Sequence, residues 1–231
     1  MISIADNFQK VSRRIQKATR EAGRRPGSVQ LLAVSKKQPA SAIRELAAQG
    51  HHRVGENYVQ EAIDKMSELK DLPLEWHFIG PIQSNKTRAI AEHFDCVQSV
   101  DRLKIAQRLN DQRPPDTDPL DVCIQVNIDD EASKSGVAPS EVPPLADAIM
   151  ALPALRLRGL MAIPDPHQPE PRLRQSFRRL AELLANLQRD WPGAEELDVL
   201  SMGMSGDMEL AIAEGATLVR VGTALFGPRD Y

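Results

Sequence analysis

Two adjacent lysines stand where an apolar run ends, and a lysine in that setting can do covalent chemistry. The stretch LLAVSKKQPA places Lys36 and Lys37 directly after branched apolar residues. A lysine that is partly desolvated and close to other cations has a depressed pKa, and its amine can form a Schiff base with a carbonyl. The alternative is a lysine whose stem lies along the strand while its ammonium reaches solvent. Position alone does not choose between these interpretations or between the two lysines.

Two glycine-containing turns near the C-terminus have the composition of a phosphate site. In SMGMSGDMELAIAEG, the small residues Ser201 and Gly203 precede a predicted helix, and the first amides of a helix have no partner inside it. In VRVGTALFG, Gly222 and Thr223 form a second turn. Backbone amides and a hydroxyl can cradle a phosphate. The alternative is that the glycines only shape tight turns and that Ser205 caps the helix.

Arg220 lies inside the apolar run that precedes the second turn. A buried guanidinium needs an acceptor or an anion, because burying an unpaired charge is very costly. One interpretation is a salt bridge to an acidic residue such as Glu56, and the other is a donor to the ring or phosphate of a bound ligand. An amine for a carbonyl and a cradle for a phosphate favour a ligand that carries both groups. Pyridoxal phosphate (PLP) and a sugar-phosphate aldehyde both meet this requirement.

Short apolar runs that alternate with amphipathic segments must position these residues. Before the first run, residues 1–23 carry an apolar stripe at helical spacing, which predicts an extra N-terminal helix. Strands that alternate with helices indicate a parallel sheet. The eight candidate strands are 29–35, 52–55, 74–79, 96–100, 122–128, 155–163, 197–201 and 217–221.

Eight such units predict an α/β fold, a (β/α)8 or TIM barrel, whose functional residues lie at the C-terminal ends of the strands. A doubly wound open sheet is the alternative, because periodicity does not reveal closure. The first strand is not followed by G-x-G-x-x-G, which disfavours a dinucleotide fold. We therefore predict one domain over 1–231, with the N-terminal helix at 1–23 and the barrel at 29–231.

The composition excludes several classes of protein. Of the 231 residues 42% are hydrophobic, which is ordinary for a protein with a buried core. The net charge of −3 comes from 29 basic and 32 acidic residues without a long block of one sign, so we expect no nucleic acid partner. No apolar stretch approaches the ~18 residues of a membrane span, so we expect no membrane partner. Cys96 and Cys123 have neither zinc nor disulfide spacing, which is typical of a cytoplasmic protein.

Ordered motifs along nearly the whole chain resemble those of one known family. They are LLAVSK, VGENYVQE, EWHFIGPIQSNK, SVDRL, SKSG, LRGLMAI, SMGMSGDME and VRVGTALFGPRDY. By these motifs the chain resembles the pyridoxal phosphate homeostasis protein family, the YggS or PROSC type, whose members resemble the barrel domain of alanine racemase. The resemblance implies a barrel of PLP fold type III that binds PLP and is not known to turn over a substrate.

The resemblance also implies roles for individual residues. Lys36, the lysine of AVSK, would hold PLP as a covalent aldimine, and Lys37 would be its neighbour. Arg220 would face the pyridine nitrogen, and Asn57 of GENYVQE would lie near the cofactor. The residues that fall where the family holds the phosphate are Ser201, Gly203, Gly222 and Thr223.

Other residues have less specific interpretations. Lys134 in SKSG is a second candidate for the Schiff base, or a loop cation near the phosphate. His77 in EWHFIG is interpreted as a hydrogen-bonded core histidine in preference to a residue at the barrel mouth, because no other histidine has metal-ligand spacing to it. The arginines predicted on the solvated face of one long helix, which buries Leu173, Phe177, Leu180, Leu184 and Leu187, are Arg172, Arg174, Arg178 and Arg179.

The function that the resemblance implies is custody of PLP in homeostasis of this vitamin B6 cofactor, with PLP and PLP-dependent apo-enzymes as the expected partners of a monomer. A PLP-dependent amino acid racemase is the main alternative. Such racemases take a tyrosine from a second domain of a partner subunit, whereas this chain ends where that domain would begin and contains only Tyr58 and Tyr231. We therefore expect no catalytic turnover. A cofactor-free Schiff-base aldolase and a pure interaction scaffold are further alternatives.

Overall fold

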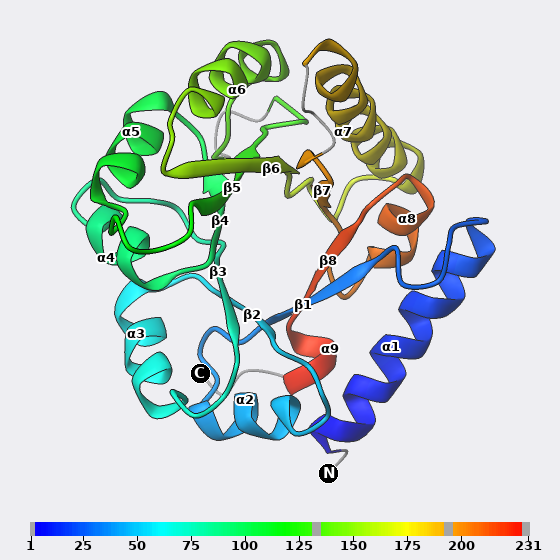
Figure 1. The fold of residues 1–231 in the computed structure, drawn as a ribbon. Helices are drawn as coiled ribbons and strands as arrows, with labels where there is room; N and C mark the ends of the chain where they lie inside the picture. Colours follow the sequence, from blue (N-terminus) through cyan, green and yellow to red (C-terminus); the bar gives the residue numbers. More distant parts are fainter. Residues whose placement is uncertain (1–2, 131–134, 192–195, 228–231) are drawn as a thin grey trace.

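The computed structural model describes residues 3–130, 135–191 and 196–227. Within these ranges eight strands form a closed barrel in chain order, and each strand is parallel to its neighbours. The last strand closes the barrel by pairing with the first, so that Arg220 lies beside Leu32. The strands in Figure 1 are β1 Gln30–Val34, β2 Arg53–Glu56, β3 Glu75–Phe78, β4 Cys96–Val100, β5 Leu120–Gln125, β6 Leu155–Met161, β7 Val199–Ser201 and β8 Leu218–Val221.

This barrel confirms the predicted fold class, and the open-sheet alternative is wrong. Each of the eight predicted apolar runs contains one strand or most of one. Several strands are shorter than their apolar runs; β7, for example, begins at Val199, two residues after the predicted start. The barrel is closed by the pairing of β1 with β8, which are far apart in the sequence, and local periodicity carries no signal for such a contact.

The helices form a ring around the barrel (Figure 1). In the described ranges none of them is long and apolar enough to cross a membrane. They are α1 Ile4–Glu21, α2 Ala40–Ala47, α3 Val59–Glu68, α4 Thr87–His93, α5 Leu103–Gln112, α6 Val142–Met150, α7 Glu170–Asp190, α8 Met208–Ala213 and α9 Thr223–Phe226, and the short 3-10 helix η1 Pro139–Glu141 precedes α6.

The extra N-terminal helix predicted over 1–23 is observed as α1, Ile4–Glu21. Its start is fixed by a capping box, in which the Ser3 hydroxyl accepts from the Asp6 amide and the Asp6 carboxylate accepts from Ser3. Its apolar stripe, with Val11 and Ile15 buried, packs against the barrel core, and the helix contacts α2, α8 and α9. An ion pair between Arg14 and Glu209 of α8, 2.7 Å long, ties its polar side to the barrel.

Helix α7 carries the arginine face that the sequence predicts. Its buried residues include the five predicted leucine and phenylalanine positions. Arg174 and Arg178 lie on the other face and pair with Glu214 at 3.3 and 3.1 Å. Arg179 donates to the carbonyl oxygen of Ile128 at 3.1 Å, so three of the four predicted arginines make structural contacts.

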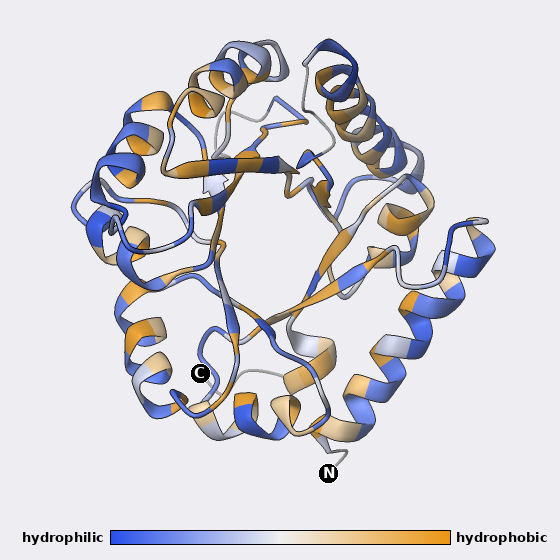
Figure 2. Ribbon diagram, viewed as in Figure 1, coloured by the Kyte–Doolittle hydropathy of each residue, from blue (hydrophilic) through white to orange (hydrophobic). Residues whose placement is uncertain are grey.

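The interior of the barrel is more polar than the layer between the barrel and its helices. Alternate residues of a strand face opposite sides. Val219 and Val221 of β8 belong to the apolar core under the helices, and Arg220 between them faces the interior. Strand β6 alternates hydrophobic and hydrophilic residues along its first half, as Figure 2 shows. The barrel interior thus contains buried polar side chains beside apolar ones such as Leu32 and Leu218, and these polar groups need hydrogen-bond partners.

Candidate functional site

The residues predicted to bind a ligand lie at the same end of the barrel. All strands are parallel, so their C-terminal ends meet on one face. Ser201 is the last residue of β7, Asn57 and Gly222 directly follow β2 and β8, and Thr223 begins α9. Lys36 and Gly203 each come two residues after their strand, β1 and β7 respectively.

The turn that presents Lys36 is held by hydrogen bonds from α3. Lys65 on α3 donates to the carbonyl oxygen of Ser35 at 2.8 Å. Glu61, one turn earlier on α3, accepts a hydrogen bond from the backbone amide of Lys37. Lys37 adopts a φ of 61°, a left-handed conformation that costs a non-glycine residue free energy. The contacts from α3 therefore fix a turn that is unfavourable by itself.

A buried ion cluster stands behind this turn. Lys65 is 6% exposed and its Nζ lies 2.8 Å from Glu56 Oε1 and 2.6 Å from Glu61 Oε1. Glu56 is fully buried and also accepts from the Ser35 hydroxyl at 2.6 Å. Burial raises the pKa of Glu56 above its ordinary value, although Lys65 and Ser35 act in the opposite direction. We call Glu56, Glu61 and Lys65 the α3 ion cluster.

The turn after β7 requires glycine at position 203. Gly203 has a φ of 91°, and a Cβ there would lie 2.6 Å from Ala211 Cβ. Helix α8 then begins at Met208 with Asp207 at its N-cap, so the interpretation of Ser205 as the helix cap is wrong. At the turn after β8, a Cβ on Gly222 would lie 3.2 Å from the carbonyl oxygen of Val34. The two predicted phosphate turns therefore bring bare backbone close to neighbouring elements.

Arg220 is a buried cation that forms no ion pair within the described residues, although the charge of the buried Asp207 acts on it. It is 4% exposed, and its guanidinium donates to Ser201 Oγ at 2.7 Å and to the carbonyl oxygen of Ala162 at 2.8 Å. Among the described residues no carboxylate forms an ion pair with it, so the predicted alternative of a salt bridge to Glu56 is wrong; Glu56 pairs with Lys65 instead. Burial lowers the pKa of Arg220 to about 10. An anion or an electron-rich ring atom at this end of the barrel would complete its environment.

Hydrogen bonds continue from Arg220 along the barrel axis. Ser201 Oγ donates to Gln98 Oε1 at 2.6 Å, and Gln98 Nε2 lies 2.9 Å from His77 Nδ1. His77 Nε2 lies 2.8 Å from Glu75 Oε1, and Arg53 pairs with the other oxygen of Glu75 at 2.8 Å. His77 is 5% exposed, which confirms that it is a hydrogen-bonded core histidine. We call these residues the axial chain: Arg53, Glu75, His77, Gln98, Ser201 and Arg220.

Asn57 offers a buried acceptor at the same end. Its Oδ1 is buried and has no hydrogen-bond partner within the described ranges. A Cβ on Gly80 would lie 2.4 Å from the Asn57 carbonyl oxygen, so the glycine lets the loop after β3 pack directly on the Asn57 backbone. The position of Asn57 is thereby fixed while one of its side-chain atoms is available to a ligand.

Lys134, the second candidate for the Schiff base, falls outside the described residues. Cys96 and Cys123 are buried and free. In the described part of the chain no group of three His, Cys, Asp or Glu residues is placed to hold a metal ion.

Sequence reasoning did not single out Gln98 or Lys65, although each left a signal. Gln98 is a polar residue in the middle of the apolar run CVQSV. Lys65 stands three residues after Ala62 and four before Leu69, which is the spacing of the buried side of α3. A polar residue at an otherwise apolar position needs a partner, and both have one.

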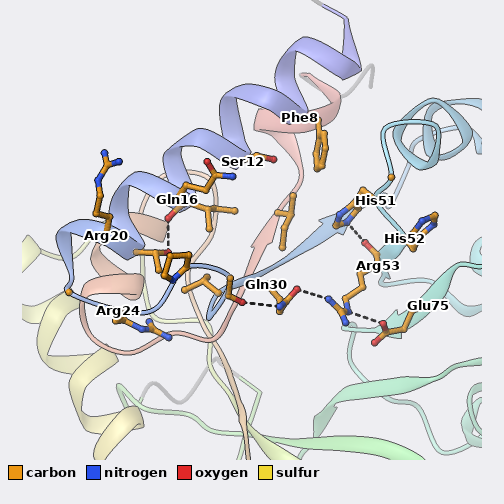
Figure 3. A pocket seen from close by; sticks show the side chains of 18 residues that line it. Phe8, Ser12, Gln16, Arg20, Arg24, Gln30, His51, His52, Arg53 and Glu75 are labelled. Carbon is orange, nitrogen blue, oxygen red and sulfur yellow. Dashed lines mark hydrogen bonds and ion pairs between the residues drawn. The ribbon is translucent and has the colours of Figure 1, made fainter.

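A cavity of about 790 Å³ lies at the opposite end of the barrel, under α1. Its walls come from α1, the segment between α1 and β1, and the N-terminal ends of β1, β2 and β3. Arg53 and Glu75 of the axial chain line it, as Figure 3 shows. The axial chain therefore joins this cavity to the end of the barrel that carries Lys36 and Arg220.

The family model that matches this closed parallel barrel is that of the alanine racemase N-terminal domain, over residues 6–230. Full-length relatives narrow the assignment. A pyridoxal phosphate homeostasis protein of Pseudomonas aeruginosa is 61% identical over 231 residues, which is 100% of this chain and 98% of the relative. One from Escherichia coli K12 is 53% identical over 234 residues, 100% of this chain and 99% of the relative. The chain belongs to the pyridoxal phosphate homeostasis protein family.

A solved structure supports the same assignment. PipY of Synechococcus elongatus PCC7942, in a structure with PLP bound, is 39% identical to this chain with a TM-score of 0.82. The match covers 97% of this chain and 100% of PipY. The family resemblance inferred from the motifs is thus confirmed.

Proposed function

We propose that this chain binds PLP at the C-terminal end of the barrel and acts in PLP homeostasis. The names of its full-length relatives and the PLP-bound structure of PipY support this function. The groups at that end suit the ligand: an amine at Lys36, bare backbone at Gly203 and Gly222, and a buried guanidinium at Arg220. Arg220 is the observation that carries the proposal, because this buried cation hydrogen-bonds a hydroxyl and a carbonyl and forms no ion pair within the described residues, so an anion or a ring nitrogen beside it would be favourable.

The proposal assigns the covalent bond to Lys36. Its Nζ condenses with the aldehyde of PLP to a Schiff base and releases one water molecule. Four residues at the ends of β7 and β8 hold the phosphate: Ser201, Gly203, Gly222 and Thr223. Asn57, with its unsatisfied Oδ1, lies beside the cofactor.

Arg220 would also decide what the bound cofactor can do. When bound, PLP supplies an electron sink whose strength depends on the group beside its pyridine nitrogen. An arginine stays protonated and can only donate, so it leaves that nitrogen unprotonated and the ring a weaker sink. We therefore propose that the protein binds and releases PLP and does not turn over an amino acid.

The remaining properties of the proposal follow from this role. PLP-dependent apo-enzymes are the proposed recipients of the cofactor. We propose a monomer of one domain over 1–231 in the cytoplasm, where the buried free thiols of Cys96 and Cys123 stay reduced.

Absorbance spectroscopy tests the proposed function directly. Protein incubated with PLP and freed of excess ligand is expected to be yellow, with a band near ~420 nm that borohydride or hydroxylamine removes. The loaded protein is expected to leave L-alanine and other L-amino acids unracemised over many hours. Protein that stays colourless after incubation would contradict PLP binding, and racemisation would contradict the custodial role.

A further inference from the structure

With Gln98 Oε1 toward Ser201 and Gln98 Nε2 toward His77, the axial chain has one consistent arrangement of protons. Arg220 Nη1 can only donate, so Ser201 Oγ accepts from it at 2.7 Å and donates its own proton to Gln98 Oε1 at 2.6 Å. Gln98 Nε2 then donates to His77 Nδ1 at 2.9 Å, which requires an unprotonated Nδ1. His77 Nε2 carries the ring proton and donates to Glu75 Oε1 at 2.8 Å. This pattern belongs to a neutral His77.

A proton on His77 Nδ1 reverses this pattern. The protonated Nδ1 needs an acceptor, and Gln98 supplies one when its side-chain amide turns over. The turn exchanges oxygen and nitrogen at nearly unchanged positions, because the two ends of an amide have almost the same shape. Gln98 Nε2 then donates to Ser201 Oγ. Since Arg220 donates to the same oxygen, both lone pairs of Ser201 are used and its hydroxyl proton is released for another acceptor.

We propose that His77 and Gln98 are positioning residues that couple a proton on His77 to the Ser201 hydroxyl, which then donates to an anion at the C-terminal end of the barrel. The proposal rests on the proposed function, in which that anion is the phosphate of PLP. His77 and Gln98 act only through Ser201. The protonation of His77 and the orientation of the Gln98 amide decide whether the Ser201 hydroxyl donates to the ligand or to Gln98.

The groups around His77 permit this protonation. Burial lowers the pKa of His77, whereas Cys96 on β4 and Glu75 on β3 raise it, and the net shift is upward, to about 10. The protonated form of His77 therefore prevails at neutral pH, and the neutral pattern belongs to alkaline pH. Asp95, just before β4, adds negative charge near the ring. Arg53 on β2 is positive, but it is paired with Glu75 at 2.8 Å.

Glu75 gives His77 a route to solvent at the far end of the barrel. Its side chain is 42% exposed and lines the cavity under α1 together with Arg53 (Figure 3). A proton reaches His77 from this cavity without passing the candidate PLP site. The barrel axis therefore connects the pH of the solvent at one end to the hydrogen bonding of Ser201 at the other.

Anion binding and protonation of His77 must then favour each other. An anion that accepts from Ser201 stabilises the protonated state and raises the pKa of His77. By reciprocity, the protein with protonated His77 binds the anion more tightly. One additional hydrogen bond to a charged group corresponds to roughly tenfold in affinity and so to about one unit in the pKa of His77.

Nitrogen-15 NMR of the His77 ring in the full chain measures this coupling. The pKa of His77 is determined without anion, with sulfate and with PLP. Sulfate keeps its charge throughout the titration, so its effect isolates the coupling from titration of the ligand. Both anions are expected to raise the pKa of His77 by about one unit, and the side-chain amide signals of Gln98 are expected to change with the same midpoint.

Two matched variants make the test specific. Gln98→Met preserves side-chain length but cannot hydrogen-bond, and it is expected to abolish the anion-dependent rise. Gln125→Met removes another buried glutamine, on β5 and outside the axial chain, and is expected to retain the rise. If Gln98→Met does not fold, Gln98→Asn shortens the same amide and is expected to weaken the rise.

The outcomes separate this proposal from the proposed function. PLP binding with an unchanged pKa of His77, or an equal rise in the Gln98 variants, overturns the coupling and leaves PLP binding intact. A sulfate-dependent rise in a protein that does not bind PLP supports the coupling and overturns the proposed function. No rise with either anion overturns the coupling outright.

Discussion

At the scale of single residues, the chemistry of Lys36 depends on groups that do not touch a ligand. The α3 ion cluster holds the turn after β1 through Lys65 and Glu61, and Lys37 adopts its left-handed backbone within that turn. A buried ion pair is costly to break from one side, because the remaining charge has no partner. The same contacts that stabilise the fold therefore also keep Lys36 in place.

Removal of Lys65 is expected to destabilise the protein strongly. Lys65→Met leaves Glu56 buried without a cation, and the free energy of unfolding in urea should fall by about 3–5 kcal/mol. Lys70→Met is the control, because Lys70 is exposed just beyond α3, and it should be nearly neutral. Adding Glu56→Gln to the Lys65 variant should recover part of the loss. A Lys65 variant as stable as the Lys70 variant would contradict the role of the cluster.

A second prediction at this scale concerns the Glu75 carboxylate and the stability of the protein in acid. Its hydrogen bond to His77 is the largest cause that lowers the pKa of Glu75 from 4.5 to about 2 in the folded state. A carboxylate with a lowered folded pKa stabilises the protein above its unfolded pKa, and this contribution is lost as the pH falls through the folded pKa. Chemical denaturation should show wild-type stability falling between pH 4.5 and 2.

The variant Glu75→Gln isolates that contribution. It should lose less stability than wild type over the same acid range, because it has no carboxylate to protonate. Glu45→Gln, on the exposed face of α2, should keep the wild-type slope. Equal slopes in the Glu75 and Glu45 variants would show that the contacts of Glu75 do not govern acid stability.

Single residues also show how far the sequence could predict the site. The AVSK motif indicated Lys36 as the candidate Schiff-base lysine, and apolar periodicity placed this lysine at the end of a strand. The partners of Arg220 were not predictable, since Ser201 and Ala162 are brought to it only by barrel closure. Glu56 was considered as its partner, but strand alternation turns Glu56 outward to Lys65 on α3.

At the scale of elements, the turn between β7 and α8 sets where backbone groups can meet a ligand. Gly203 lies in this turn with a φ of 91° and with Ala211 of α8 packed against it. Helix α8 itself starts only at Met208, later than its sequence indicated. Element bounds of this kind depend on tertiary contacts, whereas the existence and order of the strands could be predicted from apolar runs.

Alanine substitutions in this turn should distinguish packing from general flexibility. Gly203→Ala forces a Cβ to within 2.6 Å of Ala211 Cβ in a left-handed conformation, and it should cost about 1–3 kcal/mol of unfolding free energy and weaken PLP binding. Gly206→Ala is the control, because a Cβ there meets no atom within 4 Å. Thermal unfolding and PLP titration of both variants provide the measurement. Equal behaviour would mean that the turn tolerates side chains and does not form a close cradle.

At the scale of the whole molecule, barrel closure assigns different tasks to the two ends. One end gathers the lysine turn, the two glycine turns and Arg220, and the other carries the cavity under α1. The axial chain links them through side chains that face the barrel interior. The sequence could predict the first end from motifs on separate strands, but the cavity and the axial chain exist only once β8 pairs with β1.

The most direct test of the central claim is the intact mass of PLP-treated protein after borohydride reduction. Wild type and Lys37→Ala are expected to gain the mass of one pyridoxyl phosphate group, located by peptide mapping at residue 36. Lys36→Ala is expected to gain none and to lack the absorbance band near ~420 nm. A Lys36→Ala chain that still gains one such group would contradict the account and would direct the search to Lys37 or Lys134.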